Sequence, residues 1–237
     1  MTKFGLGMEL FQFSRELAVF GILVSILGVI GGIALIVHAH IASSSLSPKL
    51  FYGAGAVILI IMLPYLAMWI TLKIKASKED ILGIERIGKV YSYFSGSLEI
   101  IGMIIYFGMV IEMARYDQAG IGFLVGVICW LVHLYFIFLK IHGVRVEKNE
   151  LLGAYIGFRY AQFILCMTGL VILSATTGNL TWIEFIVGSS FFILDIGLTV
   201  ILHSIRVDRE NTSGIGTEIS TSSSTLASSS SATASAI

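Results

Sequence analysis

Six long apolar stretches, joined by short polar turns, limit what this chain can fold into. Each is close to the roughly 20 residues that a helix needs to cross the ~30 Å hydrocarbon core of a membrane. Their periodicity is helical, whereas a membrane barrel would show shorter segments of alternating hydrophobicity. The sequence therefore predicts an all-α integral membrane protein with six transmembrane helices, at residues 17–41, 51–73, 90–111, 119–141, 152–175 and 181–205.

The composition excludes a soluble protein. Hydrophobic residues make up 56% of the 237 residues and charged residues 13%, whereas an ordinary soluble domain is about 25% charged. A soluble chain of this length has no interior large enough for so much apolar surface. The basic residues are scattered over short turns, so we expect no nucleic-acid partner. The first apolar stretch is too long for a cleaved signal peptide, and we interpret it as an uncleaved span.

The basic residues are divided unequally between the two sides of the predicted membrane. Only Lys49 and Arg115 fall on one side, and the other thirteen of the fifteen fall on the opposite side. By the positive-inside rule that second side is the cytosol, so both termini are predicted to be cytosolic. The count includes Lys140 and Arg159, which we assign to the turn between the fourth and fifth spans. The span lengths favour the plasma membrane or an endosomal or lysosomal membrane.

An eight-residue phrase occurs twice in the chain. Ile141–Lys148 reads IHGVRVEK and Leu202–Arg209 reads LHSIRVDR, and each copy follows a long apolar run. This repetition indicates a duplicated membrane hairpin. We therefore predict three parallel two-helix hairpin repeats, related by an axis along the membrane normal, over residues 1–75, 76–145 and 146–209.

The basic residues of the repeated phrase are candidate contacts for lipid headgroups. Their spacing of three keeps them roughly on one face of a helix. Basic side chains at the cytosolic interface attract anionic lipid by about 1 kcal/mol each, although plain anchoring of the topology would explain the same charges. The candidates are His142, Arg145, Lys148, His203, Arg206 and Arg209.

Three ionisable residues lie deep inside predicted spans, namely Glu99, His133 and Asp195. A charge at the centre of the hydrocarbon costs about 2.5–3.5 kcal/mol on insertion scales, so such residues are candidates for function. Under the repeat alignment they fall at a similar depth, where they would relay protons or bind a small cation. The alternative is a set of isolated polar contacts between helices, worth about 0.6 kcal/mol each.

Small residues recur at a spacing of four in three of the predicted spans. This pattern lets helix backbones approach closely in lipid. It serves either packing within one bundle or the formation of a homo-oligomer, and the sequence leaves both open. The pairs are Gly28 with Gly32, Gly122 with Gly126, and Gly153 with Gly157.

The C-terminal segment differs from the rest of the chain. Residues 210–237 are rich in Ser and Thr and contain few apolar residues, which predicts a disordered cytosolic tail. Its end, Ser235, Ala236 and Ile237, has the form that PDZ domains bind by strand addition. A Ser-rich tail also produces this pattern by chance. The partners predicted are therefore membrane lipids and a PDZ-type scaffold or sorting adaptor.

The sequence contains no catalytic motif that we recognise. It lacks H-E-x-x-H, a P-loop and the paired aspartates of intramembrane aspartyl proteases, so we expect no enzyme, no cofactor and no metal. Our first hypothesis is a non-catalytic membrane organiser that offers its tail to scaffolds or sorting adaptors. The alternative is a small proton- or cation-linked transporter or channel that uses Glu99, His133 and Asp195.

Overall fold

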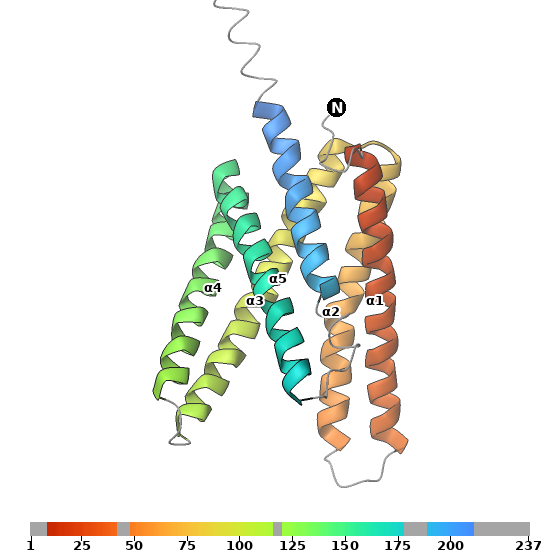
Figure 1. Cartoon of the computed structure of the whole chain (residues 1–237). Helices are drawn as coiled ribbons and strands as arrows, with labels where there is room; N and C mark the ends of the chain where they lie inside the picture. Colours follow the sequence, from red (N-terminus) through yellow and green to blue (C-terminus); the bar gives the residue numbers. More distant parts are fainter. Residues whose placement is uncertain (1–8, 42–47, 116–119, 178–188, 211–237) are drawn as a thin grey trace, which may run out of the picture.

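The computed structural model describes residues 9–41, 48–115, 120–177 and 189–210, and its elements in these ranges are helices (Figure 1). Six helices are long and apolar enough to cross a membrane, which confirms the all-α, six-helix prediction. The predicted tail beyond Glu210, with Ser235, Ala236 and Ile237, lies outside the described residues. The helices are α1 (Leu10–Ile41), α2 (Pro48–Ser77), α3 (Ile81–Arg115), α4 (Gly120–Val146), α5 (Asn149–Thr177) and a last helix, Ser189–Glu210.

Glycine lets α1 and α2 pack closely along their length. A Cβ on Gly21 would lie 2.2 Å from the Trp69 ring, so the indole sits directly on the α1 backbone. A Cβ on Gly55 would lie 2.7 Å from the carbonyl oxygen of Gly32, and one on Gly28 would lie 2.6 Å from a methionine sulfur of α2. The small-residue pair Gly28 and Gly32 therefore packs inside this hairpin.

The α2–α3 turn is shorter than the apolar pattern suggests, because α3 begins at Ile81 and the predicted span only at residue 90. Lys75 donates a hydrogen bond to Asp80 at 2.8 Å, and the Gly83 amide donates another to the same carboxylate at 2.8 Å. These two bonds lower the pKa of the Asp80 carboxyl below its usual value. Asp80 is thus an N-cap, and it starts α3 ahead of the apolar run.

The α2–α3 and α4–α5 turns share one backbone feature. Glu79 (φ 53°) and Glu147 (φ 58°) both adopt the left-handed conformation, each two residues before the next helix begins. At the first turn the Asp80 amide donates to the carbonyl of Lys75 at 3.0 Å, which closes the end of α2. The common geometry agrees with a repeated hairpin, and the three-hairpin repeat remains a prediction.

The last helix lies between the α1–α2 pair and α5 (Figure 1). In its most apolar stretch 61% of the residues are buried, against 17–22% in the other five helices. Leu194, Leu198 and Ile201 join a buried core with residues of α1, α2 and α3. Asp195 instead contacts α3, α4 and α5 through polar atoms. The last helix therefore has an apolar side and a side that presents a charge.

Candidate functional site

Asp195 is the centre of a buried hydrogen-bond network. Its side chain is 4% exposed, and both of its carboxylate oxygens accept hydrogen bonds. Oδ1 accepts from Lys140 Nζ at 2.5 Å and from Ser95 Oγ at 3.5 Å. Oδ2 accepts from the Tyr155 hydroxyl at 2.6 Å and from Arg159 Nε at 3.0 Å. Donors on α3, α4 and α5 thus hold this carboxylate on the last helix.

Glu99 of α3 is the second carboxylate of the network, and its two oxygens differ. Oε1 accepts a hydrogen bond from Arg159 NH2 at 3.0 Å and lies 3.6 Å from Lys140 Nζ. Oε2 has no hydrogen-bond partner among the described residues, although it is buried. The ring nitrogen His133 Nε2 lies 3.6 Å from this oxygen. Glu99 therefore keeps one carboxylate oxygen open to a further donor.

Gln162 fixes the protonation state of His133. Arg159 NH1 lies 2.9 Å from Gln162 Oε1, and a guanidinium only donates, so this amide oxygen must face the arginine. Gln162 Nε2 then faces His133 Nδ1 at 2.9 Å and donates to it. Because Nδ1 accepts this bond, His133 is neutral and carries its proton on Nε2. That N–H points to the open oxygen of Glu99.

The cluster is balanced in charge. Lys140 and Arg159 supply two positive charges, and Glu99 and Asp195 supply two negative ones. Their side chains are 0%, 9%, 16% and 4% exposed. We refer to these four residues as the inner cluster. Because water cannot solvate charges at such burial, each ion depends on its partners for stabilisation.

Aromatic rings surround the positive charges of the inner cluster. Lys140 Nζ lies 4.8 Å from the centre of the Tyr155 ring and 5.9 Å from that of Tyr91. The Arg159 guanidinium lies 4.8 Å from the centre of the Phe192 ring. Ring faces attract cations, most strongly when water is excluded. The rings therefore help to stabilise the two bases.

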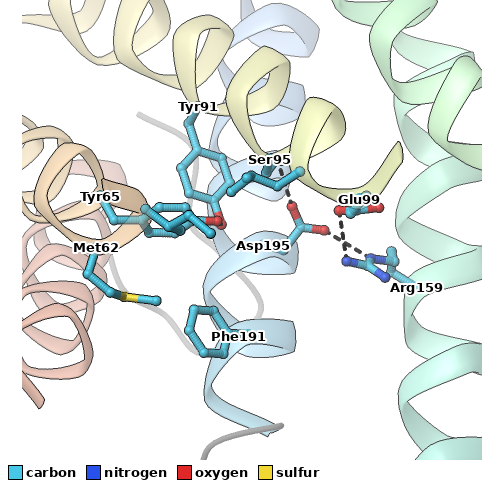
Figure 2. A pocket seen from close by; sticks show the side chains of 10 residues that line it. Met62, Tyr65, Tyr91, Ser95, Glu99, Arg159, Phe191 and Asp195 are labelled. Atoms are coloured by element: carbon cyan, nitrogen blue, oxygen red, sulfur yellow. Dashed lines mark hydrogen bonds and ion pairs between the residues drawn. The ribbon is translucent and has the colours of Figure 1, made fainter. Parts of the chain in front are cut away.

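A cavity of about 300 Å³ adjoins the inner cluster. Figure 2 shows Glu99, Arg159 and Asp195 on one side of it, with Tyr65 and Tyr91 opposite. The Tyr65 hydroxyl donates to that of Tyr91 at 3.4 Å. The remaining lining residues are mainly apolar, so the cavity combines a charged side with an apolar one. Those residues are Ile61, Met62, Ser95, Leu98 and Phe191.

The structure brings together the three residues that the sequence singled out. Glu99 and His133 are within ion-pair distance, and Asp195 shares the donors Lys140 and Arg159 with Glu99. Sequence reasoning missed the two bases because it assigned them to the turn between spans four and five. Lys140 nevertheless lies inside the predicted span 119–141 and Arg159 inside 152–175. A basic residue inside a predicted span is itself a sign of a buried polar site, and this sign was available from the sequence.

The headgroup candidates in the two copies of the repeated phrase differ in their exposure to solvent. His142, Arg145 and Lys148 are exposed at the α4–α5 turn. Arg206, by contrast, is 3% exposed and donates hydrogen bonds at 3.0 Å to the carbonyls of Gly143 and Val144. It caps the C-terminal end of α4, so it has no free face for a headgroup.

Of the other two candidates in the second copy, one is partly buried and the other forms an ion pair. His203 is half-buried beside Gly153, and Arg209 pairs with Glu85. Lys89 bridges Glu85 at 3.1 Å and Glu147 at 2.5 Å. We refer to Glu85, Lys89, Glu147 and Arg209 as the outer cluster. The hydrogen bond from Lys89 lowers the pKa of the Glu147 carboxyl.

Comparisons with known protein families, with curated proteins and with solved structures find no match for this chain.

Proposed function

We propose that this protein is a small proton- or cation-linked transporter whose solute site is the inner cluster with its adjoining cavity. The observation that carries the proposal is the burial of four balanced charges beside a cavity of about 300 Å³ that Glu99, Arg159 and Asp195 line. Intramembrane ionisable residues of this kind commonly mark ion and proton pathways.

The depth of the site supports this function. Glu99 of the inner cluster stands eighteen residues from the first residue of α3 and sixteen from the last (99 − 81 and 115 − 99), which places it about 24 Å or more from either end at ~1.5 Å per residue. Solute sites of secondary transporters lie near the middle of the bilayer.

The energetic cost of the cluster also favours a functional role. Several kcal/mol are needed to remove each ion from water, and well-packed apolar residues in place of a buried ion pair are often neutral or stabilising. Packing alone would therefore not require Lys140, Arg159, Glu99 and Asp195. The organiser hypothesis rests on the tail beyond Glu210, and no described contact favours it over transport.

The test is ion flux through the full-length chain in liposomes that contain a pH-sensitive dye. We expect wild-type protein to dissipate an imposed pH gradient faster than protein-free liposomes, in the presence of Na⁺, K⁺ or a small carboxylate. Glu99→Gln should abolish this flux. Glu147→Gln removes a carboxylate of the outer cluster and should leave the flux unchanged. Equal rates in wild-type and protein-free liposomes under every ion condition would contradict the proposal.

A further inference from the structure

The two carboxylates of the inner cluster are not equivalent acceptors for a proton. Asp195 accepts hydrogen bonds on both oxygens, three of them from Lys140, Tyr155 and Arg159 at 3.0 Å or less. Glu99 has one oxygen, Oε2, without a hydrogen-bond partner in the described part of the chain. A proton arriving at Asp195 would have to displace one of these close donors, whereas at Glu99 Oε2 it meets only His133 Nε2, which lies 3.6 Å away, beyond hydrogen-bond distance. This difference favours Glu99 over Asp195 as an acceptor of a proton.

Charge balance then determines what accompanies the proton. With both carboxylates ionised, the charges of Glu99, Lys140, Arg159 and Asp195 sum to zero. A proton on Glu99, or a cation bound to it, leaves one uncompensated positive charge among apolar helices, which is costly. A monovalent anion that binds together with the proton returns the sum to zero.

Arg159 is placed to receive that anion. It donates Nε to Asp195, NH1 to Gln162 and NH2 to Glu99. When Glu99 becomes neutral, its bond to NH2 loses its ionic character, and this N–H is available to a carboxylate, which guanidinium groups bind strongly. Arg159 and Glu99 lie side by side at the cavity (Figure 2).

The lining defines the rest of the solute. Besides the charged residues, the cavity lining includes the apolar side chains of Ile61, Met62, Leu98 and Phe191. These residues favour a solute that carries a small apolar group next to its carboxylate. A volume of about 300 Å³ limits the solute to a small molecule.

We infer that the site binds one proton on Glu99 together with one small monocarboxylate on Arg159, and that the protein moves the two together. This inference rests on the proposed transport function and names its substrate class. An O–H bond forms at Glu99 Oε2 with a proton from the aqueous phase, and the same bond breaks on release. Nothing is oxidised or reduced.

The neighbours of Glu99 fit this cycle. The groups that face it are His133 and Lys140 from α4, Tyr155 and Arg159 from α5, and Asp195 across the shared arginine. His133 Nε2 lies 3.6 Å from Glu99 Oε2, and its ring is held by Gln162, so it sets the position of the neighbouring carboxylate. His133 is thus a positioning residue and does not itself carry the proton.

Binding can be measured apart from transport, with pyruvate as the probe and the melting temperature of purified full-length protein as the readout. A ligand that binds only the native state raises Tm. We expect pyruvate to raise the Tm of wild-type protein at acidic pH but not at alkaline pH. Glu99→Gln mimics the protonated residue, so pyruvate should raise its Tm equally at both. Methylammonium should not raise the Tm of either protein.

Transport is tested with labelled pyruvate in liposomes that are alkaline inside. We expect wild-type protein to accumulate pyruvate, and the accumulation to persist when valinomycin and K⁺ clamp the membrane potential at zero. Glu99→Gln should lose pH-driven accumulation yet retain pyruvate exchange. Arg159→Lys keeps the charge but loses the guanidinium fork, and it should weaken pyruvate binding by about tenfold or more. Its elution profile on gel filtration checks that it folds.

The outcomes separate the inference from the proposed function. Uptake of methylammonium, uptake that follows the membrane potential, or pH-driven accumulation by Glu99→Gln would overturn the coupling of a proton to an anion. If pyruvate neither binds nor moves while a Na⁺ or proton flux still depends on Glu99, the inference fails and the proposed function stands. Absence of every flux contradicts both.

Discussion

The inner and outer clusters contain the same kinds of charge in different surroundings. Each has two carboxylates, one lysine and one arginine, joined by ion pairs. In the outer cluster Glu147, Arg209 and Lys89 are 53%, 50% and 32% exposed and Glu85 alone is buried, at 6%, whereas all four side chains of the inner cluster are 0–16% exposed. Water can replace a lost partner of the exposed Glu147 and Arg209, but not one of the buried Lys140 and Asp195.

This difference sets the energy scale of each cluster. Two unit charges 4 Å apart attract by about 1 kcal/mol in bulk water. They attract by about 4 kcal/mol at the effective dielectric constant of ~20 that describes protein sites, buried ones included. Exposed ion pairs contribute about 0–1 kcal/mol to stability. The same composition is therefore a minor surface feature at the helix ends and a strongly coupled unit within the bundle.

The largest effect should follow removal of one partner from the inner cluster. Lys140→Met leaves Asp195 without its closest donor, and breaking a buried ion pair in this way costs about 3–5 kcal/mol. The measurement is the free energy of unfolding in detergent micelles. A loss below about 1 kcal/mol would mean that water reaches the inner cluster, and the contrast with the outer one would disappear.

Removal of both partners should cost less than removal of one. Lys140→Met combined with Asp195→Leu leaves Glu99 paired with Arg159 at 3.0 Å, so the remaining charges still balance. We expect the double variant to be more stable than either single variant, because neither ion is left alone. A double-mutant cycle measures this coupling. Simple addition of the two single losses would show that the residues act independently.

The two copies of the repeated phrase supply a matched pair of arginines. Arg206→Met removes the hydrogen bonds to the carbonyls of Gly143 and Val144, and leaving buried acceptors unpaired costs about 1–3 kcal/mol. Arg145→Met changes the corresponding exposed residue and should alter stability by no more than about 0.5 kcal/mol. Thermal unfolding compares them. Equal losses would contradict the assignment of Arg206 as a helix cap.

The smallest effect is expected for Glu147→Gln in the outer cluster, at about 0–1 kcal/mol near neutral pH. Folding lowers the pKa of Glu147 below its usual 4.5, so its ionised form stabilises the folded state above that pH. The contribution is lost as the pH falls through the lower, folded pKa. The Tm difference between wild type and variant should therefore vanish in acid and shrink with added salt. A Tm difference that grows in acid would contradict a lowered pKa of Glu147 in the folded state.

The sequence predicted the helices better than the site. Long apolar runs specify spans directly, but the start of α3 at Ile81 depends on a cap at Asp80 that hydropathy does not register. Glu99 and Asp195 were found because an acid within an apolar run is unusual. Lys140 and Arg159 were missed because bases near span ends also satisfy the positive-inside rule.

The repeated phrase shows another limit of sequence reasoning. It predicts similar roles for Arg145 and Arg206, but the second copy lies on the buried last helix and the first at an exposed turn. Repetition of residues specifies local structure, whereas burial depends on which helices pack around each copy. Only the assembled bundle supplies that information.

The most direct test of the inner cluster as a transport site compares Glu99→Gln with Glu147→Gln in the liposome flux assay. Each substitution removes one carboxylate charge, one from each cluster. We expect Glu99→Gln to abolish dissipation of the pH gradient while still eluting as a folded species, and Glu147→Gln to retain the wild-type rate. Equal flux in the two variants would contradict a transport role for the buried charges.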